Sequence, residues 1–185
     1  MNKELIISAA LSITFLAACS DNNKEKVMVA ALPVTEGQQT SINNNASNVS
    51  SSVSVLPSFN VQDVKGKLIK LQSFKGKKVF VNLWASWCPP CREEMPSIEK
   101  LFQSVDSSKA VFVMLSMDDD FEKSKKFIQA QKLKLPIYFP AEKLPELFNV
   151  QGIPSTFIFN ENGELIQRLD GGDNYDSEKY RDMLK

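Results

Sequence analysis

Two largely apolar runs, 78–84 and 110–117, dominate the pattern of hydrophobic and polar positions along the chain. Both are short and rich in β-branched and aromatic residues, which predicts strands that are buried on both faces. Between them, apolar residues recur at helical spacing from Met95 to Val105, and this predicts a helix that begins at the cysteines, Cys88 and Cys91. A strand, helix, strand order of this length predicts a right-handed parallel crossover.

Shorter elements surround this unit. The pattern predicts, in chain order, a hairpin of strands 59–61 and 68–71, a helix over 121–133, an edge strand over 135–139, a short helix over 144–148, a hairpin of strands 155–160 and 164–169, and a helix over 177–184. The sequence therefore predicts an α/β domain with a mixed central sheet and helices on both faces.

The N-terminal segment has the pattern of a targeting signal. Residues 5–18 are apolar, follow Lys3, and are too short to span a bilayer comfortably. The sequence Leu-Ala-Ala-Cys over 16–19 resembles a bacterial lipoprotein signal, which implies removal of residues 1–18 and lipidation of Cys19. An ordinary signal peptide with an incidental cysteine and an uncleaved anchor are the alternatives.

The composition of residues 19–54 predicts a flexible tether between the N-terminal segment and the globular domain. Ser, Asn and Gln dominate this segment and no apolar period is sustained, so it cannot bury enough surface to offset the entropy of ordering it. We expect a disordered linker between the lipidated Cys19 and one globular domain over residues 55–185.

Composition narrows the classes of function. The 22 basic residues are balanced by 22 acidic ones, and the lack of a basic excess argues against nucleic-acid binding. The acidic run 118–120 is interpreted as a solvated loop that leads into a helix rather than as a metal site.

Cys88 and Cys91 are the candidate reactive residues. They lie in the turn from a strand into a helix, where one helical turn brings the sulfurs close enough to form a disulfide. Cys88 is expected at the helix N-terminus, where unpaired N–H groups and the helix dipole stabilise a thiolate. Cys91, one turn further on, is expected to be the more buried.

A structural disulfide or half of a zinc site is the alternative interpretation. A structural bridge that closes so small a ring constrains the unfolded chain little. Zinc sites normally take four Cys or His ligands, whereas this chain has no histidine and only one further cysteine, Cys19. We therefore predict redox chemistry at Cys88 and Cys91, with no metal and no cofactor.

The sequence around the cysteines resembles the thioredoxin superfamily. Trp-Cys-Pro-Pro-Cys over 87–91, Pro96, and Gly-Ile-Pro-Ser-Thr over 152–156 are most similar to the TlpA/ResA branch of extracytoplasmic thiol–disulfide oxidoreductases. The resemblance covers residues 55–185. It implies a thioredoxin-like fold and a cis peptide bond before Pro154, although trans is the default for an X–Pro bond.

The resemblance also implies roles for individual residues. By position, Cys88 attacks the substrate and Cys91 resolves the mixed disulfide. Trp84 and Trp87 flank the site and are expected to form an apolar surface beside the sulfur. The expected substrate-binding residues are Trp87, Pro89, Ile153 and Pro154.

Three positions carry further information about this branch. Thioredoxin has a buried acid at the position of Asn82, and an asparagine cannot titrate. Glu94 matches a glutamate that lies near the site in ResA-like proteins, where a partly buried carboxylate raises the cysteine pKa and moves protons. A solvated helix glutamate is the alternative for Glu94. Ser155 replaces an acid found in one subgroup of cytochrome c-maturation thioredoxins and argues against that subgroup.

These features predict a membrane-anchored thiol–disulfide oxidoreductase that reduces disulfides in exported proteins. A thiol peroxidase and a copper(I)-binding thiol chaperone are the alternatives. The expected partners are exported protein substrates and a membrane electron donor, and we expect a monomer. Because Ser20 rather than aspartate follows Cys19, the outer membrane, with the domain facing the periplasm, is the expected location in a diderm bacterium.

Overall fold

Two central strands carry the architecture. β3 (Lys78–Trp84) and β4 (Ala110–Ser116) pair in parallel along their whole length, and α1 (Pro89–Ser104) connects them. The computed structural model describes residues 54–185, so the predicted signal peptide, Cys19 and all but the end of the predicted tether lie outside the described residues. β3 is buried from Val79 onward, as its largely apolar run predicts.

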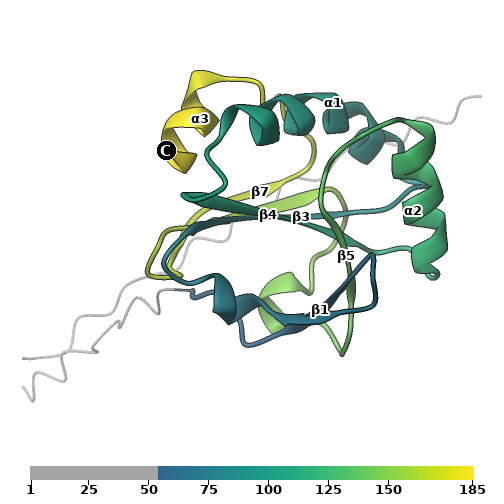
Figure 1. Cartoon of the computed structure of the whole chain (residues 1–185), viewed down its shortest axis with the longest axis horizontal. Helices are drawn as coiled ribbons and strands as arrows, with labels where there is room; N and C mark the ends of the chain where they lie inside the picture. Colours follow the sequence, from purple (N-terminus) through teal and green to yellow (C-terminus); the bar gives the residue numbers. More distant parts are fainter. Residues whose placement is uncertain (1–53) are drawn as a thin grey trace, which may run out of the picture. The chain divides into compact units, whose positions relative to one another are not determined.

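Within the described residues, β3 and β4 are interior strands of a seven-stranded sheet in the order β2-β1-β5-β4-β3-β6-β7 (Figure 1). The pairs β3·β4 and β4·β5 are parallel and the other pairs are antiparallel, so the sheet is mixed as predicted. The bounds of the remaining strands are β1 (Asn60–Asp63), β2 (Leu68–Lys70), β5 (Ile137–Pro140), β6 (Ser155–Phe159) and β7 (Leu165–Asp170).

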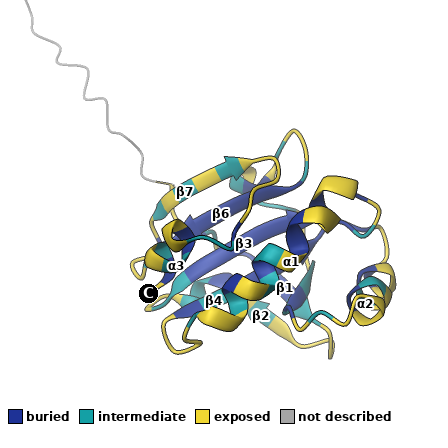
Figure 2. Ribbon diagram, turned by 90° about the horizontal axis from the view of Figure 1, so that it is seen from above, coloured by how far each residue is buried: buried dark blue, intermediate teal, exposed yellow. Residues whose placement is uncertain are grey.

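Two hydrophobic cores lie on opposite faces of the sheet, because successive side chains of a strand alternate in direction. Phe80 and Trp84 of β3 belong to the core formed with α1, α2 (Phe121–Ala130) and α3 (Glu178–Leu184). Val81 and Leu83 belong to the second core, to which the 3₁₀ helices η1 (Leu71–Phe74) and η2 (Glu146–Phe148) also contribute. In Figure 2 the central strands are mostly dark, that is, buried, whereas α2 and the loops carry most of the exposed positions. The predicted mixed sheet is confirmed; all three α-helices contribute to the first core, and the helical segments of the second core are the 3₁₀ helices η1 and η2.

The predicted edge strand is not at an edge. β5 lies between β1 and β4, and the β1–β2 hairpin supplies its outer neighbour through the pairs Val61 with Pro140 and Asp63 with Tyr138. The edges of the sheet are β2 and β7. The expectation was wrong because a short apolar segment shows that it is a strand but not which strand pairs with it.

The helix after β4 is shorter than the predicted 121–133. α2 ends at Ala130, and Lys132 follows with a positive φ of 55°. This left-handed conformation is a common way to end a helix, and the Leu133 N–H donates back to the Ile128 carbonyl at 3.1 Å. Among the described helices, α1 is the longest at 16 residues. Between residues 54 and 185, no helix has the length and apolar character needed to cross a membrane.

Candidate active site

The two cysteines lie where β3 leads into α1. Cys88 and Cys91 form a disulfide with a Cα–Cα distance of 5.3 Å. Cys88 is the N-cap residue of α1, and its sulfur accepts a hydrogen bond from the Cys91 N–H at 3.3 Å. Pro89 and Pro90 occupy the first turn of the helix, where proline gives up N–H groups that have no intrahelical partner. Cys88 is 3% exposed and Cys91 is fully buried, which confirms that Cys88 is the more accessible sulfur.

The loop before β6 lies against the disulfide. The Ile153–Pro154 peptide bond is cis, as the family resemblance implied. The Cys88 sulfur lies 3.7 Å from the Ile153 carbonyl oxygen, within reach of a weak hydrogen bond from a reduced thiol. The Pro154 carbonyl accepts a hydrogen bond from the Gly171 N–H at 2.8 Å, which ties this loop to the end of β7.

An apolar rim surrounds the sulfur. Trp87 is 63% exposed, and Pro89 and Pro90 beside it are also exposed. Trp84 does not contribute to this surface, because it is completely buried and its ring packs 5.7 Å from the ring of Phe127. The expected surface of two tryptophans is therefore made by Trp87 alone, while Trp84 belongs to the core beneath it.

Glu94 is buried beneath the site rather than solvated. It is 4% exposed, and its Oε1 accepts a hydrogen bond from Asn82 Nδ2 at 2.8 Å. Its Oε2 accepts a hydrogen bond from the Asp173 N–H at 3.3 Å. Burial raises the pKa of Glu94 from 4.5 to about 7, although both hydrogen bonds act in the opposite direction. Near neutral pH this carboxyl therefore exists in both protonation states.

A chain of buried hydrogen bonds continues from Glu94 across the sheet. Asn82 Nδ2 also donates to Thr156 Oγ1 at 2.9 Å, and Thr156 Oγ1 lies 2.7 Å from the Tyr175 hydroxyl. Asn82 Oδ1 has no hydrogen-bond partner in the structure. The pKa of Tyr175 is raised, first by burial and then by the charge of Glu94, so this hydroxyl stays protonated.

Glu94 borders an open cleft. Its volume is about 550 Å³, and it is lined by Pro90, Glu93, Glu94, Gly172, Asp173 and Asn174. Solvent in this cleft therefore reaches the edge of the Glu94 carboxyl next to the first turn of α1.

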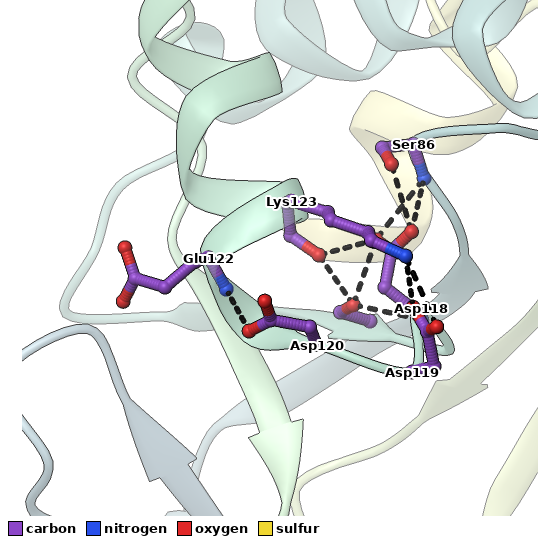
Figure 3. Close-up of polar contacts among 8 residues, drawn as sticks. Ser86, Asp118, Asp119, Asp120, Glu122 and Lys123 are labelled. Atoms are coloured by element: carbon purple, nitrogen blue, oxygen red, sulfur yellow. Dashed lines mark hydrogen bonds and ion pairs between the residues drawn. The ribbon is translucent and has the colours of Figure 1, made fainter.

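The acidic run 118–120 is only partly the solvated loop that the sequence predicted. Asp119 and Asp120 are exposed, and Asp120 caps α2 by accepting the Glu122 N–H at 2.9 Å (Figure 3). Asp118 is 4% exposed and binds Ser86, two residues before Cys88. The expectation failed for Asp118 because its burial depends on the folded contact with Ser86, 32 residues away, as well as on the nearby hydroxyls of Ser116 and Ser124. Residues 54–185 contain no group of three or more potential metal ligands.

The structure brings most of the predicted site residues together. Cys88, Cys91 and Pro89 share one helical turn, Ile153 contacts Cys88, and Glu94 lies in the second turn of the same helix. Cys19 lies outside the described residues. Sequence reasoning missed the contact of Asp118 with Ser86 and the Thr156–Tyr175 hydrogen bond, because neither has a local signature.

Comparison with known proteins agrees with this geometry. The model of the AhpC/TSA family matches residues 54–168, which include both cysteines and the Ile153–Pro154 loop. The chain belongs to the AhpC/TSA family.

Individual relatives indicate which class of protein within this family the chain resembles. The chain is 34% identical over 118 residues to thiol-disulfide oxidoreductase ResA of Bacillus thuringiensis subsp. konkukian, covering 62% of this chain and 67% of that protein. It is 37% identical over 118 residues to thioredoxin-like protein YneN of Bacillus subtilis, covering 63% and 69%. The crystal structure of StoA from Bacillus subtilis superposes with a TM-score of 0.60 at 26% identity, covering 71% of this chain and 98% of that one.

The predicted resemblance is thereby confirmed at the level of the family. This member of the AhpC/TSA family is a TlpA/ResA-like thiol–disulfide oxidoreductase with a thioredoxin-like fold. Its Cys88–Cys91 disulfide is the redox pair of the described residues, since residues 54–185 contain no other cysteine.

Proposed function

We propose that this protein is a lipid-anchored reductase of disulfides in exported proteins, with Cys88 as the attacking thiol and Cys91 as the resolving thiol. The observation that carries the proposal is the position of the Cys88 sulfur. It is the N-cap of α1, accepts the Cys91 N–H at 3.3 Å, and lies beside the exposed Trp87. A helix N-terminus stabilises a thiolate, and the exposed apolar rim gives a substrate a surface to bind.

The exchange proceeds in two steps. The Cys88 thiolate attacks one sulfur of the substrate disulfide, forming a mixed disulfide and releasing a substrate thiolate that takes up a proton. The Cys91 thiol then loses its proton and attacks the Cys88 sulfur. The second substrate thiolate leaves and is protonated, and the protein holds the Cys88–Cys91 disulfide. A membrane dithiol donor returns two electrons and two protons to this disulfide and becomes oxidised itself.

Glu94 is suited to handle the proton of the second step. Its raised pKa of about 7 makes it a base that accepts a proton near neutral pH and releases it again. It lies one helical turn beyond Cys91 and borders the open cleft. We assign it the proton exchange with Cys91, in place of the acid that thioredoxin has at the position of Asn82.

Substrate contact falls on the residues around the sulfur. Trp87, in the loop before α1, and Pro89, the first residue of α1, are exposed on either side of Cys88, and the Ile153 carbonyl lies against the Cys88 sulfur. A second cleft of about 350 Å³ adjoins this loop, and its lining includes Ile153, Pro154 and Arg168. A peptide that carries a disulfide has room there for the residues next to its cysteine.

The anchor and location rest on the sequence. The signal-like residues 1–18, Cys19 and the polar segment that follows support a lipoprotein held at the cell envelope, with its domain facing the periplasm in a diderm bacterium. Ser20 favours the outer membrane.

The reduction potential of the Cys88–Cys91 couple tests the proposal. We expect a value close to that of thioredoxin, roughly −270 mV, when the full chain is equilibrated with dithiol–disulfide buffers. A value near that of the oxidant DsbA, about −120 mV, would overturn the reductase assignment. Faster reaction with peroxide than with protein disulfides favours the peroxidase alternative. Tight copper(I) binding without disulfide reduction favours the chaperone.

A further inference from the structure

A buried carboxylate from another loop holds the segment that carries Cys88. We propose that Asp118 is a positioning residue, which fixes the β3–α1 loop through Ser86 and thereby sets the reactivity of Cys88. This inference rests on the proposed role of Cys88 as the attacking thiol. It adds to that role a residue that is separated from Cys88 in sequence and does not touch the substrate.

The contacts between Asp118 and Ser86 fix both the main chain and the side chain of the loop. The Ser86 hydroxyl donates to Asp118 Oδ1 at 2.7 Å. The Ser86 N–H is shared between Oδ1 at 3.2 Å and Oδ2 at 3.1 Å (Figure 3). Two donors of one residue on one carboxylate determine its orientation as well as its position, and bonds to a charged acceptor are the strong ones.

Asp118 is itself held from its other side. Its Oδ2 accepts a hydrogen bond from the Ser116 hydroxyl at 3.1 Å and another from the Ser124 hydroxyl of α2. The Ser116 and Ser124 oxygens lie 2.5 Å apart. A buried charge is tolerated only when donors surround it, and here a strand end, a helix and the active-site loop supply them. The position of the Asp118 carboxylate is therefore fixed by the fold, and Ser86 is hydrogen-bonded to it.

Backbone hydrogen bonds strengthen the same connection. The Met117 N–H donates to the Trp84 carbonyl at 2.7 Å, and the Cys88 N–H donates to the Ala85 carbonyl at 3.2 Å. Each end of the loop thus has a backbone bond, while Ser86 in the middle depends on Asp118. Among the described residues, the Ser86 side chain has no other hydrogen-bond partner. Without the Asp118 carboxylate, the middle of the loop therefore loses its hydrogen bonds to the segment between β4 and α2.

The loop determines where the Cys88 sulfur lies. The sulfur must remain at the N-terminus of α1 for the helix to stabilise its thiolate, and it must face the Ile153–Pro154 loop to meet a substrate. Disulfide exchange needs the attacking sulfur aligned with the bond that breaks, so small displacements lower the rate. In Ser86→Ala, which keeps the charge of Asp118, we expect loss of the contact to raise the pKa of Cys88 and slow its attack. In Asp118→Asn the removal of a negative charge opposes the rise in pKa, so there the expected effect is the slower attack.

The test combines two variants and their double. Asp118→Asn removes one acceptor oxygen, and Ser86→Ala removes the 2.7 Å hydrogen bond but keeps the backbone N–H, so it preserves the fold. The readouts are the Cys88 pKa from thiolate absorbance, the rate constant for attack on a peptide disulfide, and the melting temperature. We expect each single variant to slow attack by about tenfold. The double variant should be no slower than Asp118→Asn, because both act through one contact.

Asp120→Ala is the matched control. Asp120 lies in the same loop and caps α2 through the Glu122 N–H, but it has no contact with Ser86 in the structure. Its loss should lower the melting temperature without changing the Cys88 pKa or the rate of attack. Unchanged pKa and rate in Ser86→Ala and Asp118→Asn, or additive effects in the double variant, would overturn the proposal. A wild-type protein that does not attack the peptide disulfide would instead refute the proposed function.

Discussion

Asn82 Nδ2 donates a hydrogen bond to Glu94 Oε1 at 2.8 Å, so the residue that replaces thioredoxin's buried acid directly contacts the carboxyl proposed to take over its role. The pair is buried, and it joins the centre of β3 to the second turn of the active-site helix. The hydrogen bond stabilises the ionised form of Glu94, whereas burial opposes it more strongly and raises its pKa to about 7. The titratable group has moved from the strand to the helix.

The stability of the protein should depend on pH through Glu94. Because the folded-state pKa of this acid is raised from 4.5 to about 7, the folded state binds its proton more tightly than the unfolded state. The resulting stabilisation is present below about pH 4.5 and is lost as the pH rises through 7. It amounts to about 3 kcal/mol. Denaturant unfolding at several pH values measures this change.

Glu94→Gln isolates this effect, because it removes the titration but leaves a side chain of similar shape. The free energy of unfolding of the wild type minus that of Glu94→Gln should fall by about 3 kcal/mol between pH 4 and pH 8. Glu93→Gln is the matched control, since Glu93 is the exposed neighbour on the same helix. A difference that stays constant with pH would show that Glu94 titrates normally.

Glu94 should also couple to the cysteines. An ionised carboxylate in a poorly solvated site disfavours a nearby thiolate, so the pKa of Cys88 is raised while Glu94 is charged. Glu94→Gln should lower the Cys88 pKa by about one unit and slow the resolving step, at which Cys91 loses its proton. Thiolate absorbance and rapid-mixing kinetics measure the two effects. If neither the Cys88 pKa nor the rate of the resolving step changes, Glu94 takes no part in the proton transfer and water alone carries it out.

Asn82→Asp should create a coupled pair of carboxyls. The new carboxyl would lie within hydrogen-bond distance of Glu94 Oε1, and two such groups cannot both ionise readily. One apparent pKa of the pair should rise above 7, so the variant loses stability most strongly above neutral pH. Unfolding measured between pH 5 and pH 9 tests this, with Asn149→Asp on the surface as control. A uniform loss at every pH would mean that the substitution only disturbs packing.

The predicted location at the membrane depends on lipidation of Cys19. Mass spectrometry of the mature N-terminal peptide should find a lipid on Cys19 and no residue before it. Cys19→Ser should release the domain from the membrane fraction without changing the potential of the Cys88–Cys91 couple. An unmodified N-terminal peptide in the wild type, or fractionation with inner-membrane markers in a diderm host, would contradict the anchor or the outer-membrane assignment respectively.

The local pattern of the chain predicts most elements of the fold. β3 has the predicted limits, because a short, largely apolar run between the lysines that precede it and the cysteine turn that follows it favours a buried strand. The C-terminal hairpin agrees with its predicted strands to within one residue, and Gly163 in its turn has a positive φ of 80°. The predicted limit of α2 was wrong because Lys132 adopts a left-handed conformation that its side chain does not favour.

Long-range contacts explain what the sequence could not predict. The position of β5 inside the sheet depends on which strand pairs with it, and that partner, β1, lies far away in the chain. Asp118 looks like its exposed neighbours in an acidic run, yet hydroxyls from β4, α2 and the active-site loop bury it. The sequence leaves Glu94 open between a solvated and a buried role, because Asn82 and Asp173 meet it only in the folded state.

Trapping of a mixed disulfide is the most direct test of which cysteine attacks the substrate and which resolves the mixed disulfide. Reduced Cys91→Ser protein, mixed with a peptide disulfide, should accumulate a covalent adduct on Cys88, because the attack remains possible and its resolution is removed. Cys88→Ser should form no adduct and catalyse no exchange. Cys19→Ser in both backgrounds excludes the remaining cysteine. Adduct on Cys91 in the Cys88→Ser protein, with none in Cys91→Ser, would reverse the two roles and contradict this account.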